Sequence, residues 1–263
     1  MVTLARALGR VMRRNFQLHI AWLPLATAFR LGDYGSWRGG VFVPLGNVVD
    51  DFGLTLNTID GGTIALDFVS KGVVVAEVAA EVAAQTRPLA EGEVGLNIRA
   101  KASNSFIIKA PALVSKRISN VAAIAAKIQD SRHPSRGPRW RARYKLVTEV
   151  FTGKGVTMLA TTEADTTISL RGVAKTPQQL LDGQADATVS ANKSLGLSFV
   201  GAQGPVALRI VRIGGRGPIA SFSDSELTDN DLIIAEDLWN EDIIDDPENA
   251  DSEESSGQLS SSS

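Results

Sequence analysis

Apolar and polar residues alternate with the period of a β-strand in three stretches of this chain, at 94–105, 156–170 and 187–199. Two structures explain such alternation: an antiparallel sheet with one face in a protein core, or the strands of a membrane β-barrel. Each stretch reaches the roughly 9–11 residues that a tilted membrane-crossing strand needs. Both explanations hold in turn if a soluble form refolds into a pore, with the apolar parity facing lipid. The positions of that parity are Val94, Leu96, Ile98, Ala100, Val156, Met158, Ala164, Ile168, Val189, Ala191, Leu195 and Leu197.

The rest of the pattern predicts helices beside this sheet. Apolar residues recur at helical spacing over 4–14 and about 114–129. Residues 73–84 fit a helix or a strand, because their valines recur at helical spacing but a valine triplet opens the segment. We therefore expect an α+β fold, with a central twisted antiparallel sheet and flanking helices. Further strands are predicted at 41–45, 53–59, 63–69 and 206–213, with Asp60-Gly61-Gly62 as a hairpin turn and 176–186 as a polar connection.

The first predicted helix is basic on the side away from its apolar stripe. This pattern is typical of a packed surface helix and also of a helix that lies on a membrane. Residues 16–29 then predict a strand that runs into an apolar loop, in which Trp22, Leu23 and Leu25 are candidate membrane contacts. The arginines of the helix, also candidate membrane contacts, are Arg6, Arg10, Arg13 and Arg14.

Residues 130–145 predict a strongly basic loop, because prolines and a glycine interrupt any regular element. Arg139, Trp140 and Arg141 combine positive charge with an aromatic ring. Such a set contacts lipid headgroups at a membrane interface, clamps single-stranded nucleic acid, or forms an ordinary solvated loop.

The charges of the chain are divided between its two ends. All 27 basic side chains lie at or before Arg216, and 15 of the 29 acidic ones lie before residue 224. Residues 1–223 therefore carry a net charge of +12, and residues 224–263 carry −14. A cationic body of this kind attracts nucleic acid, acidic lipids or its own anionic tail.

The C-terminal region is predicted to consist of a short linker at the end of the body, an acidic segment and a disordered end. Residues 214–218 are predicted to form a glycine-rich linker, and we expect a body over 1–215, an acidic segment over 216–246 and disorder over 247–263. Arg216 and Gly217 mark the candidate cleavage position, since glycines leave the backbone open to a protease. The apolar residues that would anchor the acidic segment to the body are Leu232, Ile233, Ile234, Leu238, Trp239, Ile243 and Ile244.

The sequence offers little catalytic chemistry. It has no cysteine, which excludes disulfides, thiolate metal sites and cysteine nucleophiles, and its two histidines, His19 and His133, lie far apart in the chain. We find no phosphate-binding or dinucleotide-binding glycine motif. The interpretation is a non-enzyme without a cofactor, metal or small-molecule substrate. No secretory signal or apolar run of about 18 residues is visible, so a cytoplasmic protein is expected, although residues 1–32 also fit a mitochondrial presequence.

Several motifs together resemble the gasdermin family of pore-forming proteins, especially its short microbial members. Leu31-Gly-Asp-Tyr-Gly35 followed by Gly40-Val-Phe-Val-Pro-Leu-Gly46 is similar to the family's Pro-Gly-Asp and Phe…Gly stretch. Tyr144-Lys-Leu-Val-Thr-Glu-Val150 is similar to the strand that opens its second membrane hairpin, and Ala100–Ile108 to its central strand. The order of these motifs, over residues 1–215, carries the resemblance more than any one of them.

The resemblance implies a gasdermin N-terminal-domain-like fold and a cell-death effector in defence. Such a protein is an autoinhibited monomer that a protease activates by removing a C-terminal segment. It then assembles on anionic lipids into a large homo-oligomeric β-barrel in the cell membrane. This chain departs from the family in having only a short tail and in lacking the N-terminal cysteine that many bacterial members lipidate. The alternatives are a nucleic-acid-binding protein whose acidic tail mimics a polyanion, and an envelope β-protein.

Overall fold

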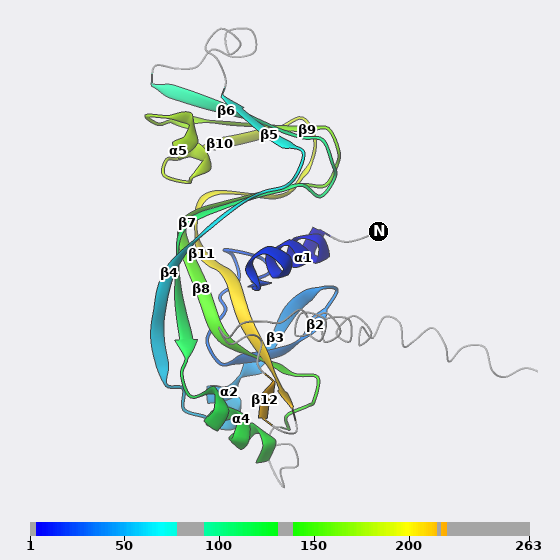
Figure 1. Cartoon of the computed structure of the whole chain (residues 1–263), viewed down its shortest axis with the longest axis vertical. Helices are drawn as coiled ribbons and strands as arrows, with labels where there is room; N and C mark the ends of the chain where they lie inside the picture. The colour runs from blue at the N-terminus through cyan, green and yellow to red at the C-terminus, as the bar shows by residue number, and fades with distance from the viewer. Residues whose placement is uncertain (1–3, 78–91, 131–138, 215–216, 220–263) are drawn as a thin grey trace, which may run out of the picture.

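The computed structural model describes residues 4–77, 92–130, 139–214 and 217–219. Figure 1 shows several long strands running along the long axis of the molecule, with shorter strands lying across its upper end. The helices are α1 Leu4–Phe16, α2 Val48–Phe52, α4 Val121–Asp130 and α5 Pro177–Leu181. The strands before α4 are β1 His19–Ile20, β2 Asp33–Arg38, β3 Val41–Asn47, β4 Thr58–Val69, β5 Val73–Glu77, β6 Glu93–Ala100 and β7 Phe106–Ile118. Those after it are β8 Lys145–Thr161, β9 Thr166–Val173, β10 Thr188–Ala191, β11 Leu195–Gly214 and β12 Gly217–Ile219.

The strands of the described ranges form two antiparallel sheets. The larger sheet has eight strands, and its long members lie in the order β4-β7-β8-β11. The smaller sheet has four strands in the order β5-β6-β9-β10. In Figure 1 the long strands rise from the larger sheet and continue into the smaller one. The predicted α+β class, with an antiparallel sheet and flanking helices, is confirmed.

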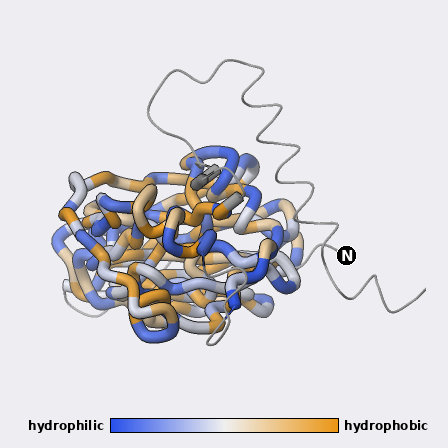
Figure 2. The backbone as a smooth tube through the Cα atoms, turned by 90° about the horizontal axis from the view of Figure 1, so that it is seen from below, coloured by the Kyte–Doolittle hydropathy of each residue, from blue (hydrophilic) through white to orange (hydrophobic). Residues whose placement is uncertain are grey.

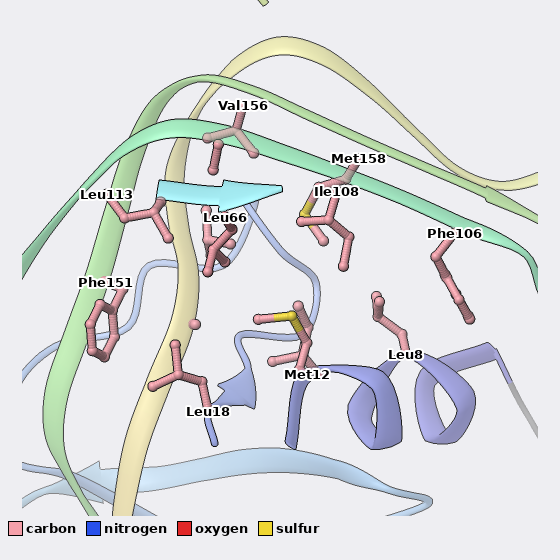
Figure 3. Packing of buried hydrophobic residues seen from close by; sticks show 14 of the residues in the cluster. Leu8, Met12, Leu18, Leu66, Phe106, Ile108, Leu113, Phe151, Val156 and Met158 are labelled. Carbon is pink, nitrogen blue, oxygen red and sulfur yellow. The ribbon is translucent and has the colours of Figure 1, made fainter. Parts of the chain in front are cut away.

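Helix α1 packs its apolar stripe onto the larger sheet. Leu8 and Met12 are fully buried, and Figure 3 shows both side chains pointing toward Phe106, Ile108 and the strands around them. Each such leucine or methionine stabilises the fold by about 1.5–3 kcal/mol relative to an exposed position. The helical spacing seen in the sequence therefore identified the buried face of α1 correctly.

Hydrophobic and hydrophilic residues alternate along the tube in Figure 2. The strands use this alternation to build separate cores on different sides of the sheets, with α2 and α4 covering one at the lower end. No helix in the described part of the chain has the length and apolar character needed to cross a membrane.

The helix predicted over 114–129 is wrong in its first part. Strand β7 extends to Ile118, and α4 begins only at Val121. Asn120 makes the corner between them: its side chain accepts the Asn57 N–H at 2.9 Å and donates to the Thr55 carbonyl at 3.0 Å. These bonds to a distant segment end the strand, and helical spacing within 114–129 could not reveal them.

The hairpin predicted at Asp60-Gly61-Gly62 is also wrong, because β4 runs straight through it. Its register against β7 shifts between Asp60 and Thr63, so the extra residues form an irregularity within the strand. A Cβ at Gly61 would lie 1.9 Å from the Ser115 Oγ, so the glycine permits a close approach of two strands. Strand β2 occupies residues for which no element was predicted, and the turn to β3 follows at Gly39 and Gly40, which both have positive φ.

Two long alternating stretches are each divided by a bend. The first contains the end of β8, a bend at 162–165 and the start of β9, and the second contains β10, a bend at 192–194 and the start of β11. Residues 73–77 resolve as strand β5, and the rest of the ambiguous 73–84 stretch lies outside the described residues. The alternation of apolar and polar residue types continues through both bends, so the sequence pattern did not reveal where the strands end.

Candidate functional site

The basic side of α1 lies at the surface. Because the apolar stripe of the helix is buried, Arg6, Arg10 and Arg14 are exposed. Arg13 is half-buried, and its positive charge helps to lower the pKa of His19. Three of the four arginines of α1 that are predicted to contact a membrane are therefore exposed in this conformation.

The apolar loop after β1 is anchored to β11. The Leu25 N–H donates to the Pro205 carbonyl at 2.7 Å, and a Cβ at Gly204 would lie 2.5 Å from the Leu25 carbonyl oxygen. Trp22 and Leu25 are half-buried and pack on the core beside α1, whereas Leu23 is 46% exposed. Of these three candidate membrane contacts, only Leu23 is exposed in this conformation, and their contact with a membrane stays a prediction.

Trp140 is buried and does not present its ring to solvent. It is 1% exposed, and its ring centroid lies 5.4 Å from Tyr34, 5.8 Å from Phe52 and 5.7 Å from Tyr144. These distances are those of tilted and edge-to-face aromatic contacts. The interpretation of Trp140 as an interfacial or base-stacking residue is therefore wrong for this conformation, where it fills a core.

The arginines around Trp140 are exposed to solvent, unlike the tryptophan itself. Arg139, Arg141 and Arg143 are exposed, while Trp140 and Tyr144 pack inward. The alternation of arginine with aromatic residues along 139–144 was the signal in the sequence that could have separated the two faces. The positive charge of this segment is accessible, and its tryptophan is not.

Tyr34 joins the aromatic cluster to the corner before α2. Burial, together with the hydrogen bond and negative charge of Asp51, raises the pKa of Tyr34 to about 12. A Cβ at Gly46 would lie 2.0 Å from an Asp51 carboxylate oxygen, so only glycine fits beside this pair. Tyr34 is thus a neutral, packed residue of the core.

The predicted membrane-facing residues of β6 and β9 lie in a core between the two sheets. Leu96, Ile98, Ala100 and Ile168 are at most 2% exposed, and Val94 is half-buried beside them. We define the inter-sheet core as the cluster formed by Leu96, Ile98, Ile107, Leu159, Ile168, Leu170, Leu180 and Leu181. The alternation at 94–100 and 168–170 therefore corresponds to buried side chains in this conformation.

The predicted residues of β8 face a different core. Val156 and Met158 are at most 1% exposed and point into the cluster that Figure 3 shows, and Leu197 belongs to the same cluster. We define the helix-side core as this cluster, which also contains Leu8, Met12, Phe106, Ile108, Ala110 and Ala160. The single apolar parity of the sequence is therefore shared between two cores, which the alternation could not show.

The remaining predicted strand positions are less buried. Ala164 lies in the bend at 162–165, outside any strand, which corrects its assignment. Val189 and Leu195 are half-buried against the inter-sheet core, and Ala191 at the end of β10 is exposed. Because β10 is at the edge of the smaller sheet, its side chains have fewer neighbours than those of β6 and β9.

The polar connection predicted at 176–186 contains the short helix α5. Leu180 is 0% exposed and Leu181 is 1% exposed, and both belong to the inter-sheet core. The sequence did carry a signal: Thr176 and Gln179 form a capping box around Pro177 at the helix start. This helix is the main element at the site that the hydrophobic pattern missed, because a helix of this length has no measurable periodicity.

Charged residues within the larger sheet pair across strands. The Glu149 carboxylate of β8 lies 3.2 Å from the Arg209 Nε of β11, where the two residues are directly opposite. The Lys109 ammonium of β7 pairs with Asp67 of β4 in the same way. These pairs neutralise charge inside the sheet. Exposed basic side chains lie on α1 and around Trp140, and also on the sheets, for example Lys116, Arg117 and Lys154.

The segment after β11 is partly strand. Gly217 belongs to β12 and lies opposite Gly214 of β11, so the prediction of an open linker is wrong at this residue. Arg216 and the acidic segment with its seven apolar anchors lie outside the described residues, as does the disordered end predicted over 247–263. The paired part of the body extends to Ile219, beyond the predicted boundary at 215.

The described residues contain no group of three or more histidine or acidic side chains that could hold a metal ion. His19 is buried beside Trp37, with ring centroids 5.0 Å apart. Burial, together with the positive charges of Arg13 and Lys145, lowers the pKa of His19 to about 3. His19 is therefore neutral at physiological pH, and His133 lies outside the described residues.

Several chains of solved structures align with this chain. No family model and no curated protein matches the chain. A solved structure of the gasdermin A3 membrane pore aligns with 87% of this chain and 99% of its own chain, at a TM-score of 0.33 and 10% sequence identity.

Proposed function

We propose that this chain is a pore-forming cell-death effector that its acidic tail holds inactive. Proteolytic removal of the tail then allows the body to oligomerise into a β-barrel in a membrane. The observation that carries the proposal is the set of four long antiparallel strands that run through both sheets with alternating apolar and polar side chains. Closed barrels satisfy every backbone hydrogen bond in lipid, and alternation gives such a barrel a lipid face and a wet face.

Anionic lipid is the proposed first partner. Arg6, Arg10, Arg14, Arg139 and Arg141 are exposed on the body. Each basic residue near an anionic leaflet contributes about 1 kcal/mol of binding, so a handful suffices for stable contact. The four long strands of one chain cannot close a wide barrel, and the active form is therefore a large homo-oligomer in the cell membrane. The inactive chain is a cytoplasmic monomer.

The acidic tail is the proposed inhibitor. Its −14 charge is covalently linked to a body of +12, so the tail competes with lipid at a high effective concentration. Its apolar anchors between Leu232 and Ile244 add contacts that a purely acidic segment would lack. Removing the tail leaves the cationic surface free for a membrane.

The proposed cleavage position is Arg216–Gly217. A protease needs an extended, accessible backbone, and Gly217 is paired in β12. Cleavage at this point therefore requires that β12 leave β11, and cleavage between 219 and 230 does not. Mass spectrometry of a limited digest distinguishes the two, because the first product ends before or after Ile219.

Dye release from liposomes tests the function. The full chain receives a specific protease site after Ile219, is purified folded, and is cut in the presence of anionic or neutral vesicles. We expect release only from anionic vesicles and only after cutting, with ring-shaped oligomers on the lipid. Salt-dependent binding of single-stranded nucleic acid by a chain that stays monomeric would instead support the alternative, which the exposed Arg139, Arg141 and Arg143 favour. If the cut, folded protein releases no dye, the pore proposal is wrong.

A further inference from the structure

Strand β12 fixes the point on the body from which the acidic tail starts. Ile219 of β12 lies opposite the exposed Arg212 of β11, and Pro218 lies opposite Ile213. Neighbouring strands are about 4.8 Å apart, so Ile219 is held beside β11. Figure 1 shows β12 and α4 together at the lower end of the larger sheet, below α1. The residues that follow Ile219 are therefore tethered to this end of the body.

A cationic segment is anchored at the same end. We define the arginine segment as the three exposed side chains that flank Trp140 or follow it closely: Arg139, Arg141 and Arg143. Trp140 itself belongs to one core cluster with Ile213 of β11 and with residues of α4. Because Ile213 lies opposite Pro218, the arginine segment and the start of the tail meet at the end of β11.

Aromatic packing holds the arginine segment in place. Trp140 is 1% exposed, and its ring centroid lies 5.7 Å from that of Tyr144. With these rings turned inward, three positive charges within five residues face solvent. Among the described residues, Arg141 and Arg143 have no ion-pair partner. A cationic surface that is already ordered loses little conformational freedom when an anionic segment binds to it.

The tail supplies the complementary charge soon after it leaves the body. The first acidic residues beyond β12 are Asp224, Glu226, Asp229 and Asp231, and no basic residue interrupts them. Asp224 is five residues beyond Ile219, or about 17 Å of extended chain, and Asp231 is twelve residues beyond it, or about 40 Å. Several negative charges can therefore reach the arginine segment from the same tether.

Helix α1 also presents arginines, but it lies further from the start of the tail. Its apolar stripe packs in the helix-side core, a cluster that contains neither Trp140 nor Ile213. In Figure 1 it lies at mid-height beside the larger sheet, away from β12. Exposed charges attract one another over a Debye length of only about 8 Å at physiological ionic strength. The arginine segment is therefore favoured over α1 as the partner of the first acidic residues.

We infer that residues 224–231 of the tail dock on the arginine segment and not on α1. Exposed ion pairs are individually weak, but the tether at β12 gives the acidic residues a high effective concentration at this site. The inhibitory consequence of the contact rests on the proposed function, because covering these arginines blocks a pore only if they bind lipid. The contact itself does not depend on that function.

A spin label in the tail of the full chain tests where the tail lies. Asn230→Cys places a neutral nitroxide among the first acidic residues, and the chain has no other cysteine. The nitroxide broadens the amide NMR signals of residues near it. We expect loss of signal intensity over 139–145 and little loss over α1. Raising the ionic strength to about 1 M, where the Debye length is about 3 Å, should restore the lost signals.

Two matched pairs of charge reversals separate docking from simple tethering. Arg141→Glu with Arg143→Glu alters the arginine segment, and Arg10→Glu with Arg14→Glu changes the charge of α1 by the same amount. All four arginines are exposed, so both variants should melt like the parent. The first pair should weaken docking roughly two- to thirtyfold, which corresponds to two exposed ion pairs, and should restore the signals of 139–145. The second pair should leave those signals broadened.

Three results would overturn the inference. Signal loss centred on α1 would place the acidic residues there, and equal effects of the two variant pairs would show non-specific attraction. Signal loss that is confined to the neighbours of β12 and unchanged by salt would show a tether without docking. If a variant does not melt like the parent, the salt titration of the parent gives the same decision. Dye release after cutting is measured separately: a docked tail without release contradicts only the proposed function, and release without a docked tail contradicts only this inference.

Discussion

Lysine at Ala191 tests whether β10 enters a membrane. Ala191 pairs with Ile168 of β9, so it lies on the same, apolar face of the smaller sheet as that residue, yet it is exposed. Ser190 is its neighbour, is also exposed, and points to the opposite face. Ala191→Lys and Ser190→Lys therefore add the same charge one residue apart, on opposite faces of one strand.

The expected effect of each lysine on stability follows from the exposure of both positions. Surface substitutions away from special features change the free energy of unfolding by about 0.5 kcal/mol or less, so both variants should melt like the parent. In the membrane form, a lysine on the lipid face near mid-bilayer costs about 2–4 kcal/mol per subunit. That cost corresponds to roughly a thirtyfold to several hundredfold loss in the equilibrium for insertion. A lysine on the wet face carries no such cost.

The assay is dye release from anionic liposomes, with thermal melting as the control for folding. We expect Ala191→Lys to lose most of its release after the tail is cut, and Ser190→Lys to retain it. Attraction of the added charge to the lipid is equal in the two variants, so the difference reports on the face alone. Equal release by two variants of unchanged melting temperature would falsify the assignment of this face to lipid.

Three further measurements address the body of the protein. Trp140→Ala should cost about 3–5 kcal/mol in urea denaturation because the ring is buried among Tyr34, Phe52 and Tyr144, and a loss below about 1 kcal/mol would contradict that burial. His19, whose pKa is about 3 when folded and 6.5 as the ordinary value, binds its proton more readily in the unfolded chain. Its contribution to stability is present above pH 6.5 and is lost as the pH falls toward 3, by about 2 kcal/mol at pH 5. His19→Phe should remove this part of the acid sensitivity, and parallel stability curves for the variant and the parent would refute it. A cut after Ile219 should raise binding to anionic vesicles and leave the melting of the body nearly unchanged, whereas loss of the folded body would show that the tail is part of its core.

Local pattern was sufficient for the elements with a strong period. Side-chain spacing within one element was enough to predict the apolar stripe of α1, the alternation of β6 and the strand at 206–213, which is part of β11. The antiparallel α+β class follows from the same spacing. The division of charge between body and tail is likewise complete in the sequence, since it requires no contact.

Tertiary contacts decided what spacing could not. The Asn120 side chain ends β7 by bonding to residues some sixty positions away, and Gly61 permits a close approach where a turn was expected. Trp140 lies in a basic loop by composition, but Tyr34 and Phe52 come from distant segments to enclose it. In each case the partner is remote in the chain, so no window of sequence contains it.

The candidate site shows the same limit most clearly. The even-numbered apolar residues from Leu96 to Ile108 form one alternating pattern in the sequence. A period of two residues identifies which side chains share a face of the sheet, but it does not say what covers that face. The bend at 101–105 and helix α5 assign part of that face to the inter-sheet core and the rest to the helix-side core. The amphipathic character of the strands was therefore a property of the sequence, whereas the partner of each apolar face was decided by the tertiary structure, because burial depends on which distant surfaces meet.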